Sequence, residues 1–196
     1  EIKNQLPGVK HWLVVDNGNA SNYEDMANKG DGSSPGIKHS ADDLLFLYTG
    51  GTTGMPKGVM WRHSDLFQVL GAGGNPRLGT PPCTDLAEFL ERLKVSPRTV
   101  NMPLPPIMHG TGLLSAVGAM AGGGTCITLT SKSFEPELAL ENITKHKITQ
   151  VTIVGDAFAR PMLEVLDENS GKYDISSVGV INSSGVMWTR EIKAGL

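Results

Sequence analysis

The fold class is decided by a unit that opens with Thr125-Cys126-Ile127-Thr128-Leu129 and closes with Gln150-Val151-Thr152-Ile153-Val154. Both runs are short and apolar, which is typical of buried strands. Between them, residues 135–146 place apolar side chains at helical spacing. A strand, a helix and a second strand in this order predict a right-handed crossover that joins two parallel strands.

The same alternation continues on both sides of this unit, from about Thr99 to the end of the chain. We expect further strands at residues 98–102 and 178–182, and helices at residues 111–120, 156–167 and from about 189 onward. The sequence therefore predicts an α/β fold with a mainly parallel sheet and flanking helices. Ligands of such sheets bind beyond the carboxyl ends of the strands, so we expect the site among the loops at that edge.

A second informative stretch lies upstream and reads Leu45-Phe46-Leu47-Tyr48-Thr49-Gly50-Gly51-Thr52-Thr53-Gly54-Met55-Pro56-Lys57-Gly58-Val59. It begins as an apolar strand and becomes a loop of glycines and threonines that Pro56 and Lys57 close. Glycine lets successive N–H groups converge on an anion, and Lys57 adds a positive charge that no acid between Tyr48 and Ser64 neutralises. The pattern favours a polyphosphate-binding loop over an ordinary surface loop. We expect the signature loop, the turn at His109 and the turn at residues 183–185 to converge on one edge of the sheet.

This loop differs from the P-loop of kinases and GTPases, in which Gly-Lys is followed by Ser or Thr at the start of a helix. Here Pro56 precedes Lys57 and Gly58 follows it. The spacing therefore argues against a phosphotransferase of the P-loop kind.

Residues 48–59 resemble the AMP-binding signature of the adenylate-forming enzymes, with Gly50 where that signature usually has Ser. This superfamily includes acyl-CoA synthetases, adenylation domains of peptide synthetases and firefly luciferase. The resemblance gives Lys57 a catalytic role as well as a binding role. It implies that the phosphates of ATP are contacted by Thr49, Gly50, Gly51, Thr52, Thr53, Gly54 and Lys57.

Two further segments carry the resemblance. Three prolines and two glycines surround His109 in residues 102–112, which excludes a helix interior and predicts a rigid turn before the next helix. The resemblance places His109 beside the acyl group and the α-phosphate as a pocket-shaping catalytic residue, although a histidine held in a turn by hydrogen bonds would read the same way. Ser184, Gly185 and Val186 resemble the turn on which the adenine rests in this superfamily. Met187 and Trp188 follow them here and depart from the usual pattern of a small residue, Pro and Leu. Trp188 fits a packing role equally well.

Together with Gly50 and Trp61-Arg62-His63, the Met187-Trp188 variation is most similar to actinobacterial CoA ligases for fatty acids or steroid acids. The implied reaction is ATP-dependent activation of a carboxylic acid to an acyl-adenylate, followed by transfer to coenzyme A, with Mg²⁺ accompanying ATP. Residues 1–196 are then expected to be part of the large N-terminal domain of an acyl-CoA synthetase-like fold, without the small C-terminal domain and inactive alone. The helix expected after His109 is apolar, so it could line a pocket for a hydrophobic acid or pack in the core.

Two other functions stay open, namely an adenylate former with another acceptor such as a carrier protein, and a nucleotide-binding module without catalysis. A net charge of −3 and the lack of a basic run give no sign of a nucleic-acid partner. Cys83 and Cys126 lack metal-ligand spacing and favour a reduced, cytoplasmic protein without a metal site of its own. No apolar run is long enough to suggest a transmembrane segment.

Overall fold

The structure is a computed structural model that describes residues 2–13, 23–50, 54–70 and 81–196. The chain divides into two compact units, residues 1–39 and residues 40–196. The first unit holds the short 3-10 helix η1 (Ile2–Gln5) and helix α1 (Tyr23–Ala27), and neither contributes a buried residue. The second unit carries the sheet and all the sites discussed below.

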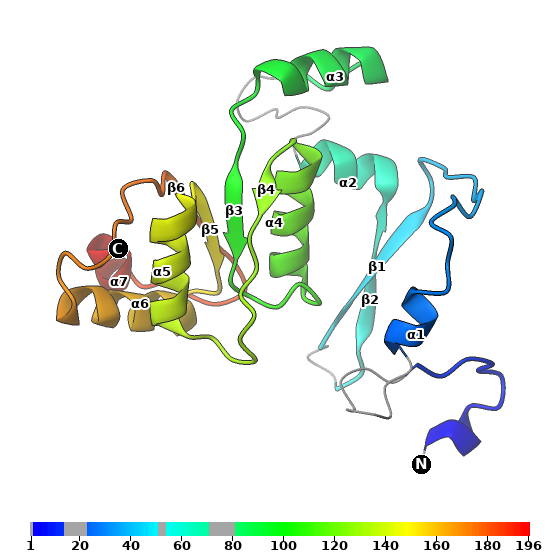
Figure 1. The fold of residues 1–196 in the computed structure, drawn as a ribbon, viewed down its shortest axis with the longest axis horizontal. Coiled ribbons are helices and arrows are strands. Elements are labelled where there is room, and N and C mark those ends of the chain that lie inside the picture. Colours follow the sequence, from blue (N-terminus) through cyan, green and yellow to red (C-terminus); the bar gives the residue numbers. More distant parts are fainter. Residues whose placement is uncertain (1, 14–22, 51–53, 71–80) are drawn as a thin grey trace. The chain divides into compact units, whose positions relative to one another are not determined.

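A four-stranded parallel sheet with the order β4-β3-β5-β6 forms the centre of the second unit (Figure 1). Its strands are β3 (Val100–Pro103), β4 (Thr125–Cys126), β5 (Gln150–Ile153) and β6 (Val180–Ser183). The connecting helices are α4 (Gly110–Ala121), α5 (Pro136–His146) and α6 (Asp156–Glu168), and α7 (Arg190–Gly195) follows the last strand. The α/β fold with a mainly parallel sheet is therefore confirmed.

Strand β4 is shorter than the sequence predicts. The apolar run at residues 125–129 pairs as a strand only through Cys126, and one more bond, from the Ile127 N–H to the Asn101 carbonyl at 2.8 Å, extends the ladder. Ile127 and Leu129 instead pack against the hydrophobic core as partly buried side chains. Apolar character here reflects burial, which a strand and a packed loop share.

The two faces of the parallel sheet have different chemistry. One face contributes Met102, Val151 and Ile153 to a core that it shares with α5, α6 and α7. Helix α4 lies on the opposite side of the sheet from α5 (Figure 1), and there its Ser115 contacts Asn101 and Thr152. Both of these polar residues are buried, so α4 covers a polar strip of the sheet rather than an apolar one.

The signature stretch forms a separate antiparallel hairpin of β1 (Leu44–Thr49) and β2 (Lys57–Arg62), paired from Leu44 with Arg62 to Thr49 with Lys57. Helix α2 (His63–Val69) follows directly. Helix α3 (Leu86–Val95) begins after Asp85, whose carboxylate accepts a hydrogen bond from the Glu88 N–H at 2.9 Å. That contact caps the helix in the position expected of an N-terminal aspartate.

Candidate functional site

The turn between β3 and α4 presents His109 at the start of α4. The His109 N–H donates to the Pro106 carbonyl at 3.0 Å, and the His109 carbonyl accepts from the Leu113 N–H at 2.9 Å. A Cβ on Gly112 would lie 2.5 Å from the Pro105 carbonyl oxygen, so only glycine lets the proline-rich turn pack this closely on the helix. The His109 side chain itself is exposed and makes no capping hydrogen bond. The expectation of a turn that delivers His109 to the helix start is confirmed.

The turn after β6 meets the first turn of α4. Thr111 Oγ1 and Ser184 Oγ lie 2.6 Å apart and share a hydrogen bond. Gly185 has a φ of +86°, and Val186 is 58% exposed. The structure thus brings the residues expected to support adenine next to the turn that carries His109, at the carboxyl ends of the parallel strands.

Asp156, at the start of α6, holds the second half of this turn. Its carboxylate accepts hydrogen bonds from the Thr189 N–H and the Thr189 hydroxyl, both at 2.9 Å. The Thr189 N–H is the main reason that the pKa of Asp156 lies below its ordinary value of 3.8. The sequence pattern indicates Asp156 only as the first residue of a helix. The Gly-Asp pair that directly follows a buried strand was the sequence signal that could have indicated a further role for Asp156.

Gly155, one residue earlier, is also required by this arrangement. Its φ is +52°, and an added Cβ would lie 2.2 Å from the Met187 carbonyl oxygen. Its N–H donates to Ser183 Oγ at 3.0 Å, while the Asp156 N–H donates to the Met187 carbonyl at 3.2 Å. The loop after β5 and the turn after β6 are therefore held together as one structure.

Trp188 packs against the hydrophobic core as a partly buried residue, and the Lys193 ammonium lies 5.1 Å from the centre of its ring. Its indole nitrogen is buried and has no hydrogen-bond partner in the part of the chain that the structure describes. Of the two roles considered for Trp188, the structure supports packing.

The signature hairpin places Thr49 and Lys57 opposite each other at its end, where the Thr49 hydroxyl donates to the Lys57 carbonyl at 3.4 Å. Gly50 and Gly54 are exposed, and Gly54 has a φ of +85°. Lys57 is exposed and forms no ion pair with any described residue. Gly51, Thr52 and Thr53, which were expected to contact phosphate, lie outside the described residues.

One expectation about the site is wrong. The signature loop does not follow a strand of the parallel sheet, because β1 pairs only with β2 in a sheet of its own. The loop returns the chain antiparallel, because the seven residues between β1 and β2 are too few for a crossover to a parallel strand. Two of the three predicted loops share the edge of the parallel sheet, and the third belongs to the hairpin.

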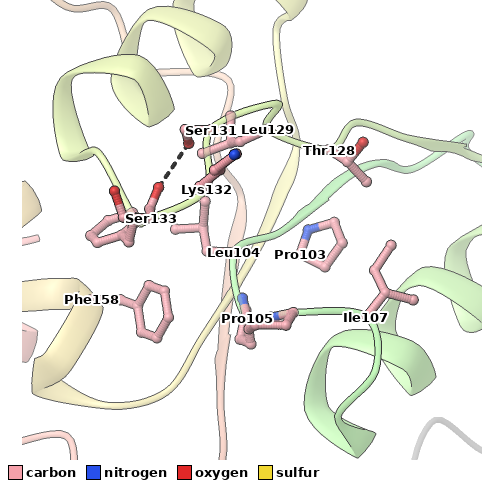
Figure 2. A pocket seen from close by; sticks show the side chains of 12 residues that line it. Pro103, Leu104, Pro105, Ile107, Thr128, Leu129, Ser131, Lys132, Ser133 and Phe158 are labelled. Carbon is pink, nitrogen blue, oxygen red and sulfur yellow. Dashed lines mark hydrogen bonds between the residues drawn. The ribbon is translucent and has the colours of Figure 1, made fainter. Parts of the chain in front are cut away.

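Two apolar cavities flank these elements. One, of about 520 Å³, is lined by the proline-rich turn, residues 128–129 and 131–134, and Phe158. Figure 2 shows Phe158 and Ile107 at its opposite ends and Lys132 at its edge. The other, of about 330 Å³, lies between α2 and α4 and is lined mainly by leucine, valine, alanine and phenylalanine side chains, with His63 among them. The helix after His109 thus serves core packing and also lines an apolar cavity.

Within the described residues, no three His, Cys, Asp or Glu side chains come close enough together to hold a metal ion. No helix in the same part of the chain is both long enough and apolar enough to cross a membrane.

Comparison with known proteins gives consistent matches. The sequence model of a family described as AMP-binding enzyme matches residues 1–193. The chain is 35% identical over 204 residues to the medium-chain acyl-CoA ligase Mig of Mycobacterium avium, covering 100% of this chain and 36% of that relative. It is 35% identical over 200 residues to a medium/long-chain-fatty-acid–CoA/3-oxocholest-4-en-26-oate–CoA ligase of Mycolicibacterium smegmatis, covering 96% of this chain and 36% of the relative.

Among solved structures, a long-chain-fatty-acid-CoA ligase of Archaeoglobus fulgidus superposes with a TM-score of 0.68 at 22% identity, over 98% of this chain and 35% of that one. This likeness supports the fold. The chain spans about a third of the length of the curated relatives it matches.

Proposed function

Because the chain belongs to the AMP-binding enzyme family, we propose that it is part of an ATP-dependent acyl-CoA ligase, an acid–thiol ligase that forms AMP. The identity to two mycobacterial acyl-CoA ligases supports this reaction class. The observation that carries the proposal is the contact between Thr111 and Ser184 at 2.6 Å. It sets the proposed adenine support beside the turn that holds the proposed acyl-contacting histidine.

In the proposed reaction, a carboxylate oxygen of the acid attacks the α-phosphorus of ATP. The bond from that phosphorus to the bridging oxygen breaks, and pyrophosphate leaves with the electron pair. The sulfur of coenzyme A then attacks the acyl carbon, AMP departs, and the thiol proton is released to solvent. Fixed N–H groups, hydroxyls and a positive side chain stabilise the charge on the transferring phosphoryl group.

We assign the phosphate contacts to the signature loop, with Lys57 balancing charge. Its exposed ammonium forms no ion pair with a described residue, which leaves it available to a polyphosphate. Ser184, Gly185 and Val186 would support the adenine, and His109 would contact the acyl group. The phosphate contacts would come from Thr49, Gly50, Gly51, Thr52, Thr53, Gly54 and Lys57.

Mg²⁺ would accompany ATP, since this cation is usually bound through phosphates and only one or two carboxylates. The described residues offer no cluster of three metal-binding side chains. We therefore assign no residue of this chain and no step of the reaction to the metal.

For the acid, we propose a fatty or steroid-type carboxylic acid, because the two relatives are named for substrates of these kinds. We place the ligase in the cytoplasm on the strength of its cysteine pattern. We also propose that residues 1–196 form part of the large N-terminal domain and do not turn over alone, because they match about a third of a complete relative.

Product analysis tests this function. The chain and the full-length protein are incubated separately with ATP, Mg²⁺, coenzyme A and a panel of fatty, aromatic and steroid acids. We expect AMP, pyrophosphate and acyl-CoA from the full-length protein and no turnover from the 196-residue chain. ADP as product, or no product with any acid, would overturn the ligase proposal. AMP and pyrophosphate without acyl-CoA would point to a different acceptor, such as a carrier protein.

A further inference from the structure

A groove lined mainly by residues with hydroxyl or amide side chains lies between the first turns of α4 and the carboxyl ends of β5 and β6. Its volume is about 360 Å³, which suits a small ligand or part of one. Beside Gly110 and Leu114, its lining consists of side chains that bear a hydroxyl or an amide: Thr111, Ser115, Thr152, Asn182, Ser183 and Ser184. The cavity between α2 and α4 has the opposite, mainly apolar, lining.

A buried hydrogen-bond chain forms the floor of this groove. The Asn101 amide Nδ2 donates to Ser115 Oγ at 2.9 Å, and Ser115 Oγ lies 2.5 Å from Thr152 Oγ1. Asn101 is fully buried and Thr152 is 2% exposed. Asn101 Oδ1 is buried and accepts no hydrogen bond within the part of the chain that the structure describes.

Counting protons shows what the floor offers to a ligand. Ser115 and Thr152 carry one hydroxyl proton each, and the hydrogen bond between them uses one of the two. Because Asn101 donates its hydrogen bond to Ser115, it accepts neither of the two hydroxyl protons. One hydroxyl proton therefore stays available at the floor of the groove, whichever of the two hydroxyls donates to the other. A ligand that covers this floor but carries no acceptor oxygen leaves that hydroxyl donor without a hydrogen bond.

The position of the groove indicates which part of the substrates it holds. Its mouth includes Gly110 and Thr111, immediately after His109, and Ser184, at the start of the proposed adenine support. A group bound there is next to the proposed reaction centre, and the groove continues from that point to Thr152 beneath α4. This position favours the acid over the nucleotide as the occupant of the groove.

We propose that this groove holds the acid and that Ser115 and Thr152 select an acid whose body carries an oxo or hydroxyl oxygen over the plain alkyl acid. The proposal rests on the ligase function proposed above. The substrate oxygen would accept the available hydroxyl proton, so its binding would satisfy a donor that an alkyl chain would bury unpaired. A site built to hydrogen-bond a substrate oxygen discriminates strongly against analogues that lack it.

The test compares octanoic acid with isomeric oxo-octanoic acids that carry the carbonyl at successive positions. The full-length protein is assayed for pyrophosphate release with each acid, and kcat/KM is compared. We expect at least one oxo isomer to exceed octanoic acid by about tenfold or more. In Thr152→Val and Ser115→Ala this ratio should fall to about twofold or less, because each change removes a hydroxyl from the floor.

Thr128→Val is the matched control, since Thr128 lies in the other cavity, beside the proline-rich turn. It should leave the ratio unchanged. If Thr152→Val fails to fold, Ser115→Ala still tests the proposal. Ser115 lies on α4 and is not fully buried, so its truncation should disturb the fold less.

The possible failures are distinguishable. Pyrophosphate release with all acids but no preference for any oxo isomer, or a preference that survives in both variants, would overturn the selectivity proposal and leave the ligase function intact. No pyrophosphate release with any acid would overturn the ligase function and this inference with it.

Discussion

The parallel sheet and the signature hairpin are stabilised in different ways. In the sheet, Met102, Val151 and Ile153 are at most 1% exposed. In the hairpin, Phe46 is 49% exposed and Met60 is 62% exposed, although both are as apolar as the core residues. The hairpin pairs along a continuous backbone ladder but contributes no residue to the core that the sheet shares with three helices.

This contrast matters for the proposed chemistry. The turns that carry His109 and Ser184 follow strands of the sheet, and the hydrogen bond between Thr111 and Ser184 joins them. The phosphate loop lies at the end of a hairpin that buries little apolar surface. We therefore expect substitutions in the sheet to change stability, and substitutions in the hairpin to change nucleotide handling. The predictions below test that division.

The largest effect on stability is expected for Leu140→Ala in α5. Leu140 is fully buried in the core, so its truncation leaves a cavity and should lower the free energy of unfolding by about 2–5 kcal/mol. The matched change in the hairpin, Leu44→Ala, removes a side chain that is 45% exposed and should cost less than about 1 kcal/mol. Urea unfolding followed by circular dichroism measures both. Equal losses of unfolding free energy in the two variants would show that side-chain packing stabilises the hairpin as much as it stabilises the sheet.

Gly155→Ala should give the next largest effect. The substitution forces a side chain into a φ of +52° and against the Met187 carbonyl, which together should cost about 1–3 kcal/mol from strain alone. Gly171→Ala is the control, because Gly171 has a φ of +81° but nothing within 4 Å of an added Cβ. Urea unfolding followed by circular dichroism measures both. A smaller loss for Gly155→Ala than for Gly171→Ala would contradict the close approach of the two loops.

Asp156→Asn should produce a loss of stability that depends on pH. Because hydrogen bonds from Thr189 lower the pKa of Asp156 in the folded state, the carboxylate stabilises the fold above its ordinary pKa of 3.8. This contribution falls as the pH drops below 3.8 and is lost once the pH passes the lowered pKa. The wild type should therefore be more stable than Asp156→Asn at neutral pH, and the two should converge in acid.

Thermal unfolding at a series of pH values measures this difference. Asp167→Asn, on the exposed side of the same helix, serves as the control and should show no such convergence. A gap between wild type and Asp156→Asn that persists at low pH would assign the effect to packing rather than to charge.

Lys57→Ala should have the smallest effect on stability and a specific effect on the nucleotide. Lys57 is exposed and forms no ion pair with a described residue, so the free energy of unfolding should change by less than about 0.5 kcal/mol. Pyrophosphate release by the full-length protein should fall by about tenfold or more, because the phosphoryl charge loses a cation. Lys145→Ala, at the end of α5, should leave both quantities unchanged. Unaltered turnover in Lys57→Ala would remove Lys57 from the proposed mechanism.

The sequence by itself determined the α/β class, most helix positions and the turn at His109, because these depend on local properties. Apolar periodicity locates a helix such as α5, and prolines on either side of Leu104 exclude a helix interior. The resemblance of residues 48–59 was also readable, since a glycine-rich loop with Pro56-Lys57 is a contiguous pattern. The family match confirms that resemblance, while the roles of the individual site residues stay predictions.

Only the tertiary structure decided which of these segments meet. The hydrogen bonds from Thr189 to Asp156 and the Asn101–Ser115–Thr152 chain both join residues that their local sequence does not link. Local patterns report whether a side chain is buried or exposed, but not against which partner. Strand order and the packing of α4 on the polar face of the sheet fix those partners, and both arise from contacts between distant parts of the chain.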